Sequence, residues 1–220
     1  MTDVFAIGSC RLIAPLHRLA REGSIGFSNE SQSWYGHSAA EMLQRLDHMQ
    51  GRRVLSDDQL EYVLDIESCS TAASECSTHI TLPPVGLFEI STRNSYWRDG
   101  HILHSTLVSK RDVKDAEGKV ATFDAVETQL MDLAAQFRHL VLVCNIAYKA
   151  DLKATDQNRL QLNYFLKNLG HAHANITVVD PNEMIDAVQP QKDLPDNNHF
   201  YPAFEGRMER HYKALLAGLS

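Results

Sequence analysis

The sequence predicts an α/β protein in which a mostly parallel sheet of about five strands lies between two layers of helices. Short apolar runs alternate along the chain with helix-like segments, and this alternation is typical of βαβ crossovers. The runs at residues 4–7 and 139–146 are almost continuously apolar, as expected for strands covered on both faces. A chain of 220 residues that is 44% hydrophobic can bury a full core, so we expect one domain over residues 1–220.

Each strand is predicted from a short, largely apolar run bounded by glycine, proline or small polar residues. The predicted strands are residues 3–7, 61–67, 86–91, 139–146 and 175–180. Because the carboxyl ends of parallel strands share one rim, the polar residues that follow them are the candidates for a site. These residues are Ser9, Ser68, Ser91 to Asn94, Asn145 and Asp180.

Helices are predicted wherever apolar residues recur at helical spacing. They span about residues 12–21, 123–136, 156–169 and 204–216, with a further helix that Ser38 caps and Gly51 closes. We expect Pro15 in the first turn of its helix and Gly170 just past the end of another. The predicted loops are residues 23–36 and 195–202, and residues 95–120 are expected to form a loop insertion over one edge.

Composition excludes several classes of protein. A net charge of −7 without any basic block argues against nucleic-acid binding. No apolar run approaches the roughly 20 residues that span a bilayer, and the first residues lack the pattern of a secretory signal. The four cysteines, Cys10, Cys69, Cys76 and Cys144, have no paired spacing. We therefore expect reduced thiols in a cytoplasmic protein.

The strongest candidate for chemistry is Ser9, which follows the first strand at a tight turn where a helix begins. A serine needs a base to take its proton, usually a histidine that a carboxylate orients. Asp196 and His199, three residues apart before the last helix, can supply both groups.

An oxyanion formed during acyl transfer also needs hydrogen-bond donors. The backbone amide after Ser9 is one candidate, because it lies at a helix start. Asn94 and Asn145, at neighbouring strand ends, are others. We expect the oxyanion and substrate-binding residues to be Cys10, Arg11, Asn94 and Asn145.

In this order, the motifs resemble those of the SGNH (GDSL-like) hydrolase superfamily, and within it the GSCFA family, named for a Gly-Ser-Cys-Phe-Ala start. Gly8-Ser9-Cys10 matches the first block, with Arg11-Leu12 in place of Phe-Ala, and Asp196-Asn197-Asn198-His199 matches the Asp-x-x-His block. The resemblance implies a three-layer, SGNH/flavodoxin-like fold and a serine-dependent esterase or acyltransferase. Its partner would be an acyl ester of a sugar, a polysaccharide precursor or a similar small molecule. Ser9 would then be the nucleophile, His199 the base and Asp196 its orienting carboxylate.

Three alternatives stay open at this point. The superfamily's Gly-x-Asn-Asp block is missing, since the chain offers Ser91-Thr92-Arg93-Asn94, and this favours a non-catalytic module that binds a glycan or an acyl ligand. Cys10 at a helix start could itself be a nucleophile. The pairs His101/His104 and His171/His173 could each supply two metal ligands, but a zinc site needs three or four, so we expect no metal and no cofactor.

Aromatic pairs also stand in the predicted loops, at Trp34-Tyr35, Tyr96-Trp97 and Phe200-Tyr201. Aromatic rings at the rim of a site can stack on sugar rings, whereas the simpler interpretation is that they cap the core.

Overall fold

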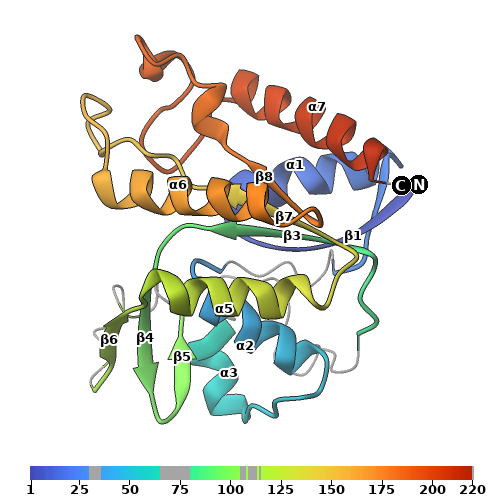
Figure 1. The fold of residues 1–220 in the computed structure, drawn as a ribbon, viewed down its shortest axis with the longest axis vertical. Coiled ribbons are helices and arrows are strands. Elements are labelled where there is room, and N and C mark those ends of the chain that lie inside the picture. Colours follow the sequence, from blue (N-terminus) through green and yellow to red (C-terminus); the bar gives the residue numbers. More distant parts are fainter. Residues whose placement is uncertain (30–35, 65–79, 105–107, 109–112, 114, 220) are drawn as a thin grey trace.

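The computed structural model describes residues 1–29, 36–64, 80–104, 108, 113 and 115–219 (Figure 1). Its centre is a five-stranded sheet in the order β2-β1-β3-β7-β8, in which every neighbouring pair is parallel. The strands are β1 (Thr2–Ile7), β2 (Ile25–Phe27), β3 (Val85–Ile90), β7 (His139–Cys144) and β8 (Ile176–Val179). The predicted three-layer α/β fold with a parallel sheet is confirmed.

Helices cover both faces of this sheet. Figure 1 shows α1 and α7 on one side and α2 and α5 on the other, and the apolar residues of α6 join the core on the side of α2 and α5. The α-helices are α1 (Cys10–Arg21), α2 (Ala39–Met49), α3 (Asp57–Leu64), α5 (Phe123–Ala134), α6 (Gln157–Ala172) and α7 (Pro202–Gly218). Two short 3₁₀ helices, η4 (Pro181–Glu183) and η5 (Pro190–Lys192), lie between β8 and α7.

Side-chain alternation along β1 divides the apolar core into two parts. Phe5 and Ile7 face the core under α2, α5 and α6, whereas Val4 and Ala6 face the core under α1 and α7. All four side chains are fully buried. This two-sided burial explains why the strand has no polar alternation in the sequence.

One predicted strand is wrong. Residues 61–64 belong to α3, and residues 65–67 lie outside the described part of the chain. The fifth strand of the sheet is instead β2, which lies in the segment predicted to be a loop. With three residues, of which only Ile25 is fully buried, β2 lacks an apolar run long enough to reveal an edge strand.

Two helix boundaries also differ from prediction. Because α1 begins at Cys10, Pro15 is its sixth residue and lies beyond the first turn. Gly170 lies inside α6, which ends at Ala172. The caps predicted for α2 are confirmed: Ser38 Oγ accepts a hydrogen bond from the Glu41 amide at 3.3 Å, and Gly51 has a φ of 72° directly after the helix.

The described part of the predicted loop insertion at residues 95–120 contains a small antiparallel sheet. Its strands, in the order β5-β4-β6, are β4 (Asn94–Arg98), β5 (His101–Leu103) and β6 (Glu117–Val120). A tight turn at Asp99 and Gly100, both with positive φ, joins β4 to β5. Within β4, the Trp97 side chain donates a hydrogen bond to the Ser95 hydroxyl at 2.8 Å.

The two ends of the chain meet at one side of the main sheet (Figure 1). Thr2 Oγ1 donates a hydrogen bond to the Leu216 carbonyl of α7 at 3.0 Å. No helix among the described residues is long and apolar enough to cross a membrane. The predicted features Trp34, Tyr35, Ser68, Cys69 and Cys76 lie outside the described residues.

Candidate active site

Ser9 occupies the tight turn between β1 and α1. It is the N-cap of α1, with extended backbone angles, and its Oγ accepts a hydrogen bond from the Arg11 amide at 3.3 Å. Because Ile7 of β1 pairs with Phe88 of β3, Gly8 comes to lie beside Glu89. A Cβ atom at Gly8 would stand 2.9 Å from Glu89 Cβ and 2.8 Å from Leu12 Cδ2. The absence of a side chain at Gly8 therefore lets Ser9 approach β3.

Ser9 makes two hydrogen bonds to one carboxylate oxygen of Glu89. Its hydroxyl donates to Glu89 Oε2 at 2.5 Å and its backbone amide donates to the same oxygen at 2.9 Å. Glu89 is only 1% exposed and is the last residue but one of the apolar strand β3, near its carboxyl end. The strand pairing thus places a buried anion directly under the turn that carries Ser9.

The charge of Glu89 is balanced by Arg11, in the first turn of α1. Arg11 Nε donates to Glu89 Oε1 at 3.0 Å, and Arg11 Nη2 forms an ion pair with the same oxygen. Burial alone would raise the pKa of the Glu89 carboxyl, but the Arg11 guanidinium and the hydrogen bonds from Ser9 and Arg11 outweigh it. The pKa of Glu89 is therefore lowered, and the residue is an anion at neutral pH.

Asp196 and His199 form a compact turn before α7. Asp196 Oδ1 accepts hydrogen bonds from the amides of Asn198 at 2.6 Å and His199 at 2.9 Å. The His199 ring nitrogen Nδ1 lies 2.8 Å from Asp196 Oδ2, so the carboxylate is placed to orient the imidazole. The side chains of His199 and Asp196 are 59% and 44% exposed, and Nε2 of the imidazole is not used in this pairing. A carboxylate that orients an imidazole in this way is one part of what a general base requires.

Two arginines connect this turn to the rest of the site. Arg11 Nη1 donates to the Asn198 carbonyl at 3.1 Å, with the same guanidinium that pairs with Glu89. Arg159, from the first turn of α6, donates through Nη1 to the carbonyls of Asn197 at 3.1 Å and Ile146 at 3.0 Å. A continuous set of hydrogen bonds therefore runs from Ser9 through Glu89 and Arg11 to the residue before His199.

Cys10 is half-buried at the first position of α1. Burial raises the pKa of its thiol, and the neighbouring Arg11 guanidinium only partly opposes this effect. A protonated thiol is a weak nucleophile, so Ser9 is the better candidate at this turn. The Cys10 backbone amide makes no hydrogen bond to a described residue, as expected for the first turn of a helix.

The structure places the two candidate asparagines differently. Asn145 is buried after β7, and its Nδ2 donates to the Ser91 carbonyl at 3.3 Å. Its carbonyl accepts hydrogen bonds from Asn163 and Asn182, both at 2.9 Å, and its Oδ1 has no partner among the described residues. Asn94 is exposed at the start of β4, where its amide donates to Thr92 Oγ1, and among the described residues no hydrogen bond joins it to Ser9. Both assignments stay predictions.

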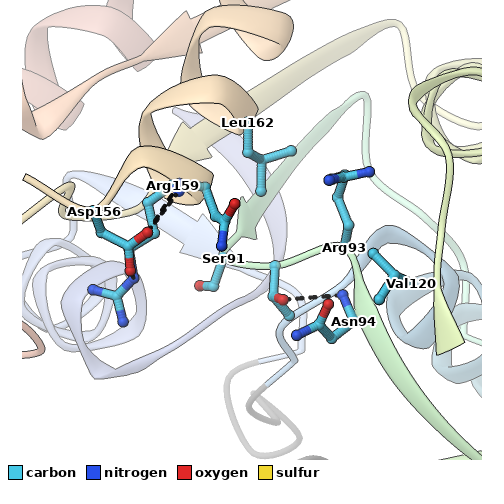
Figure 2. Close-up of a pocket in the computed structure, with 9 residues that line it drawn as sticks. Ser91, Arg93, Asn94, Val120, Asp156, Arg159 and Leu162 are labelled. Atoms are coloured by element: carbon cyan, nitrogen blue, oxygen red, sulfur yellow. Dashed lines mark hydrogen bonds and ion pairs between the residues drawn. The ribbon is translucent and has the colours of Figure 1, made fainter. Parts of the chain in front are cut away.

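A pocket of about 490 Å³ adjoins this site (Figure 2). Residues after β3 form one side of it, and the start of α6 forms the other. Its lining is polar apart from Val120 and Leu162, and consists of Ser91, Thr92, Arg93, Asn94, Val120, Asp156, Asn158, Arg159 and Leu162. Ser91 and Arg159 connect the pocket to Glu89 and to the turn of His199.

Glu89 and Arg159 are not among the site residues predicted from the sequence. The signal for Glu89 was present, because a glutamate in the apolar run Val85–Ile90 must be paired if the strand is buried on both faces. Arg159 gave no such signal, since an arginine in the first turn of a helix is ordinarily a surface residue. Among the described residues, no three His, Cys, Asp or Glu side chains group as metal ligands would.

A protein-family profile described as the TviD N-terminal domain matches residues 2–114, which is more than half of the chain. The chain belongs to this family. The matched residues include Ser9, Arg11 and Glu89, whereas Arg159, Asp196 and His199 come after them in the chain. No curated protein matches the chain. The narrower GSCFA resemblance stays a prediction.

Solved structures of esterases share the fold of this TviD N-terminal domain family member. The acetylxylan esterase Axe2 from Geobacillus stearothermophilus aligns with a TM-score of 0.51 and 11% identity, over 98% of this chain and 94% of that one. A member of the lipolytic G-D-S-L family from Veillonella parvula aligns with a TM-score of 0.53 and 13% identity, over 98% and 97% of the two chains. At these identities the likeness establishes the fold, and the SGNH-like fold is thereby confirmed.

Proposed function

We propose that this protein is a serine-dependent esterase or acyltransferase, with Ser9 as nucleophile, His199 as general base and Asp196 as the carboxylate that orients His199. The observation that carries the proposal is the bridge made by Arg11. One guanidinium binds both the carboxylate under Ser9 and the carbonyl of the residue before His199. The esterase folds of the compared structures add support, and Axe2 variants described as catalytic mutants replace one serine and one aspartate.

The reaction requires the Ser9 hydroxyl to turn from Glu89 to the imidazole. His199 Nε2 then takes the hydroxyl proton while Ser9 Oγ attacks the carbonyl carbon of the ester. The tetrahedral oxyanion would accept a hydrogen bond from the Cys10 amide at the start of α1. Collapse breaks the ester bond, and the leaving alcohol takes the proton from His199. Water or an acceptor hydroxyl then attacks the acyl-serine and gives its proton to His199. The bond between the acyl carbon and Ser9 Oγ breaks, His199 returns the proton to Ser9 Oγ, and the acid or new ester leaves.

Glu89 is a poor candidate for the base itself. Its lowered pKa, caused by Arg11 and the Ser9 hydrogen bonds, makes transfer of a serine proton to it unfavourable. Its role is instead to hold the turn. The base must have a solvent-facing nitrogen or oxygen that is not already held in a hydrogen bond. His199 Nε2 meets that condition, because the pairing with Asp196 uses Nδ1.

The polar pocket beside the site supports an alcohol part with several hydroxyl groups, such as a sugar. Hydroxyl, amide and guanidinium groups line it (Figure 2), and these side chains are suited to hydrogen bonding with hydroxyls. An acyl ester of a sugar or a polysaccharide precursor is therefore the substrate class that we propose.

A non-catalytic binding module on the same scaffold is the second candidate. This candidate is favoured because the Ser9 hydroxyl donates its hydrogen bond to Glu89, at 2.5 Å, and not to His199. In that case the pocket would bind the glycan or acyl ligand without turnover.

Intact-mass analysis after treatment with a fluorophosphonate separates these candidates. We expect one adduct on the wild type, its loss in Ser9→Ala, and its retention in Cys10→Ala, which keeps the backbone amide. Absence of an adduct on folded wild-type protein would overturn the enzymatic proposal and leave the binding module. An adduct that disappears only in Cys10→Ala would instead make the cysteine the nucleophile.

A further inference from the structure

Two arginines from different helices bind consecutive carbonyls of the turn that carries His199. Arg11 of α1 holds the Asn198 carbonyl and Arg159 of α6 holds the Asn197 carbonyl, both at 3.1 Å. The turn's own hydrogen bonds, from the amides of Asn198 and His199 to Asp196, are internal to it. Internal bonds fix the shape of the turn but not its place relative to Ser9.

Each arginine is in turn held by a firm part of the fold. Arg11 is 8% exposed and is paired with the buried Glu89 of β3. Arg159 is 22% exposed, and its Nη1 also binds the Ile146 carbonyl, two residues after β7. The two guanidinium groups therefore tie the turn to the carboxyl ends of β3 and β7.

This arrangement has an electrostatic cost. Burial and the nearby positive charge of Arg11 lower the pKa of Arg159, and Asp156 and Glu89 offset this effect only in part. Carbonyl oxygens in a turn can be satisfied by water at no such cost. Placing two like charges beside one turn is therefore better explained by the position that they enforce than by the stability that they add.

We propose that Arg11 and Arg159 are positioning residues, which together hold the Asp196–His199 turn where the imidazole can reach Ser9. The inference rests on the proposed esterase or acyltransferase function. The two side chains would then have a positioning role without touching the reacting atoms. Each of them binds a different carbonyl of the turn. A displacement of the base by about 1 Å can lower the rate about 100-fold, so small losses of placement are measurable.

The first test uses Arg159→Ala, because Arg159 is accessible and lies outside the buried Glu89 pair. With 4-nitrophenyl acetate, an ester too small to depend on the pocket, we expect kcat to fall about 10- to 100-fold while KM changes less than about threefold. Gln157→Ala is the matched control, since Gln157 lies in the same turn of α6 but is exposed, does not line the pocket and donates its side-chain hydrogen bond to Thr155. We expect it to keep the wild-type kcat with this ester.

Two readouts separate placement from a general loss of stability. Guanidinium at about 20 mM, far below denaturing concentrations, should restore part of the kcat of Arg159→Ala by occupying the vacated space. The NMR signal of the His199 ring N–H that faces Asp196 should persist, because that pair lies within the turn. Arg18→Ala, which loses surface ion pairs to Glu205 and Glu209, should show neither a kcat loss nor a response to guanidinium.

A second variant, Arg11→Lys, tests the other contact while it keeps a positive charge for Glu89. We expect a folded protein with lowered kcat, because one ammonium cannot reproduce the fork that binds Glu89 and Asn198 together. An unchanged kcat in both Arg159→Ala and Arg11→Lys would overturn the inference, and so would a kcat loss in Arg159→Ala that guanidinium leaves unchanged. If Ser9→Ala kept wild-type turnover, the proposed function itself would fail, whatever the arginine variants showed.

Discussion

Ser9 Oγ lies 2.5 Å from Glu89 Oε2, so the hydroxyl at the start of α1 rests on a buried carboxylate. The same oxygen also accepts the Ser9 amide, while the other carboxylate oxygen faces Arg11. The Ser9 turn is thus held by the negative charge of the Glu89 carboxylate on β3. The stability of the fold and the placement of Ser9, the proposed nucleophile, are therefore coupled through Glu89, and the first prediction concerns this coupling.

Glu89→Gln should destabilise the protein at neutral pH, by about 3–5 kcal/mol, because it leaves Arg11 as an unpaired buried charge. The folded-state pKa of Glu89 is lowered, so its contribution is present above the unfolded-state pKa, about 4.3, and is lost as the pH falls through the lower folded value. Urea unfolding of the wild type and Glu89→Gln between pH 7 and pH 3 should show that the difference in their free energies of unfolding becomes smaller in acid. A gap that stays constant would contradict this account.

Gly8→Ala should destabilise the protein by about 1–3 kcal/mol and slow the reaction with fluorophosphonate. The added Cβ would stand 2.9 Å from Glu89 Cβ and 2.8 Å from Leu12 Cδ2, so the turn would have to move away from β3 and from the first turn of α1. Thermal unfolding and the rate of adduct formation measure the two effects. Gly218→Ala, where a Cβ meets nothing within 4 Å, should alter neither. Equal behaviour of the two variants would refute the steric argument.

His199→Ala should lower kcat by at least about 10³-fold and leave the unfolding temperature nearly unchanged, because the imidazole is largely exposed and, among the described residues, its hydrogen bonds stay within its own turn. Asp196→Asn should also lower kcat, since the imidazole loses its orienting carboxylate. Steady-state kinetics with an acyl ester gives the comparison. His171→Ala, at an exposed position in the last turn of α6, is the control. A normal kcat in His199→Ala would exclude His199 as the base.

Cys10 should react slowly with iodoacetamide at neutral pH. Burial raises the pKa of its thiol, so the reactive thiolate becomes abundant only above the usual range for cysteine. Peptide mapping of the modified protein across pH 7 to 10 gives the rate at this one site. Rapid modification at pH 7 would show that the thiol is activated, and would reopen Cys10 as the nucleophile.

The sequence was sufficient to predict the layers of the fold, because the apolar runs of β1, β3, β7 and β8 are long enough to be recognised. It was insufficient for β2, whose three residues pair with β1 at the edge of the sheet. The run at residues 61–67 was misassigned because its charged and apolar residues alternate irregularly. In the structure, Leu60 and Val63 are buried at helical spacing.

The candidate site was predictable in part for a similar reason. Ser9, Asp196 and His199 carry local signals, namely a turn after a strand and a spacing of three. Glu89 and Arg159 act through partners 80 and 38 residues away, and no local pattern reports such contacts. The groups proposed to perform chemistry are thus easier to find in the sequence than the groups proposed to hold them in place.

The hydrogen bond between Thr2 and Leu216 brings the two ends of the fold within reach of a short linker. A circular permutant could therefore be made, with the old ends joined and new ones opened at Asp99-Gly100, in the exposed turn between β4 and β5. Such a rearrangement would place Ser9 after His199 in the order of the permuted chain. Synthesis on the ribosome would then complete the His199 turn before the Ser9 turn, which reverses the order in which the two halves of the site can form.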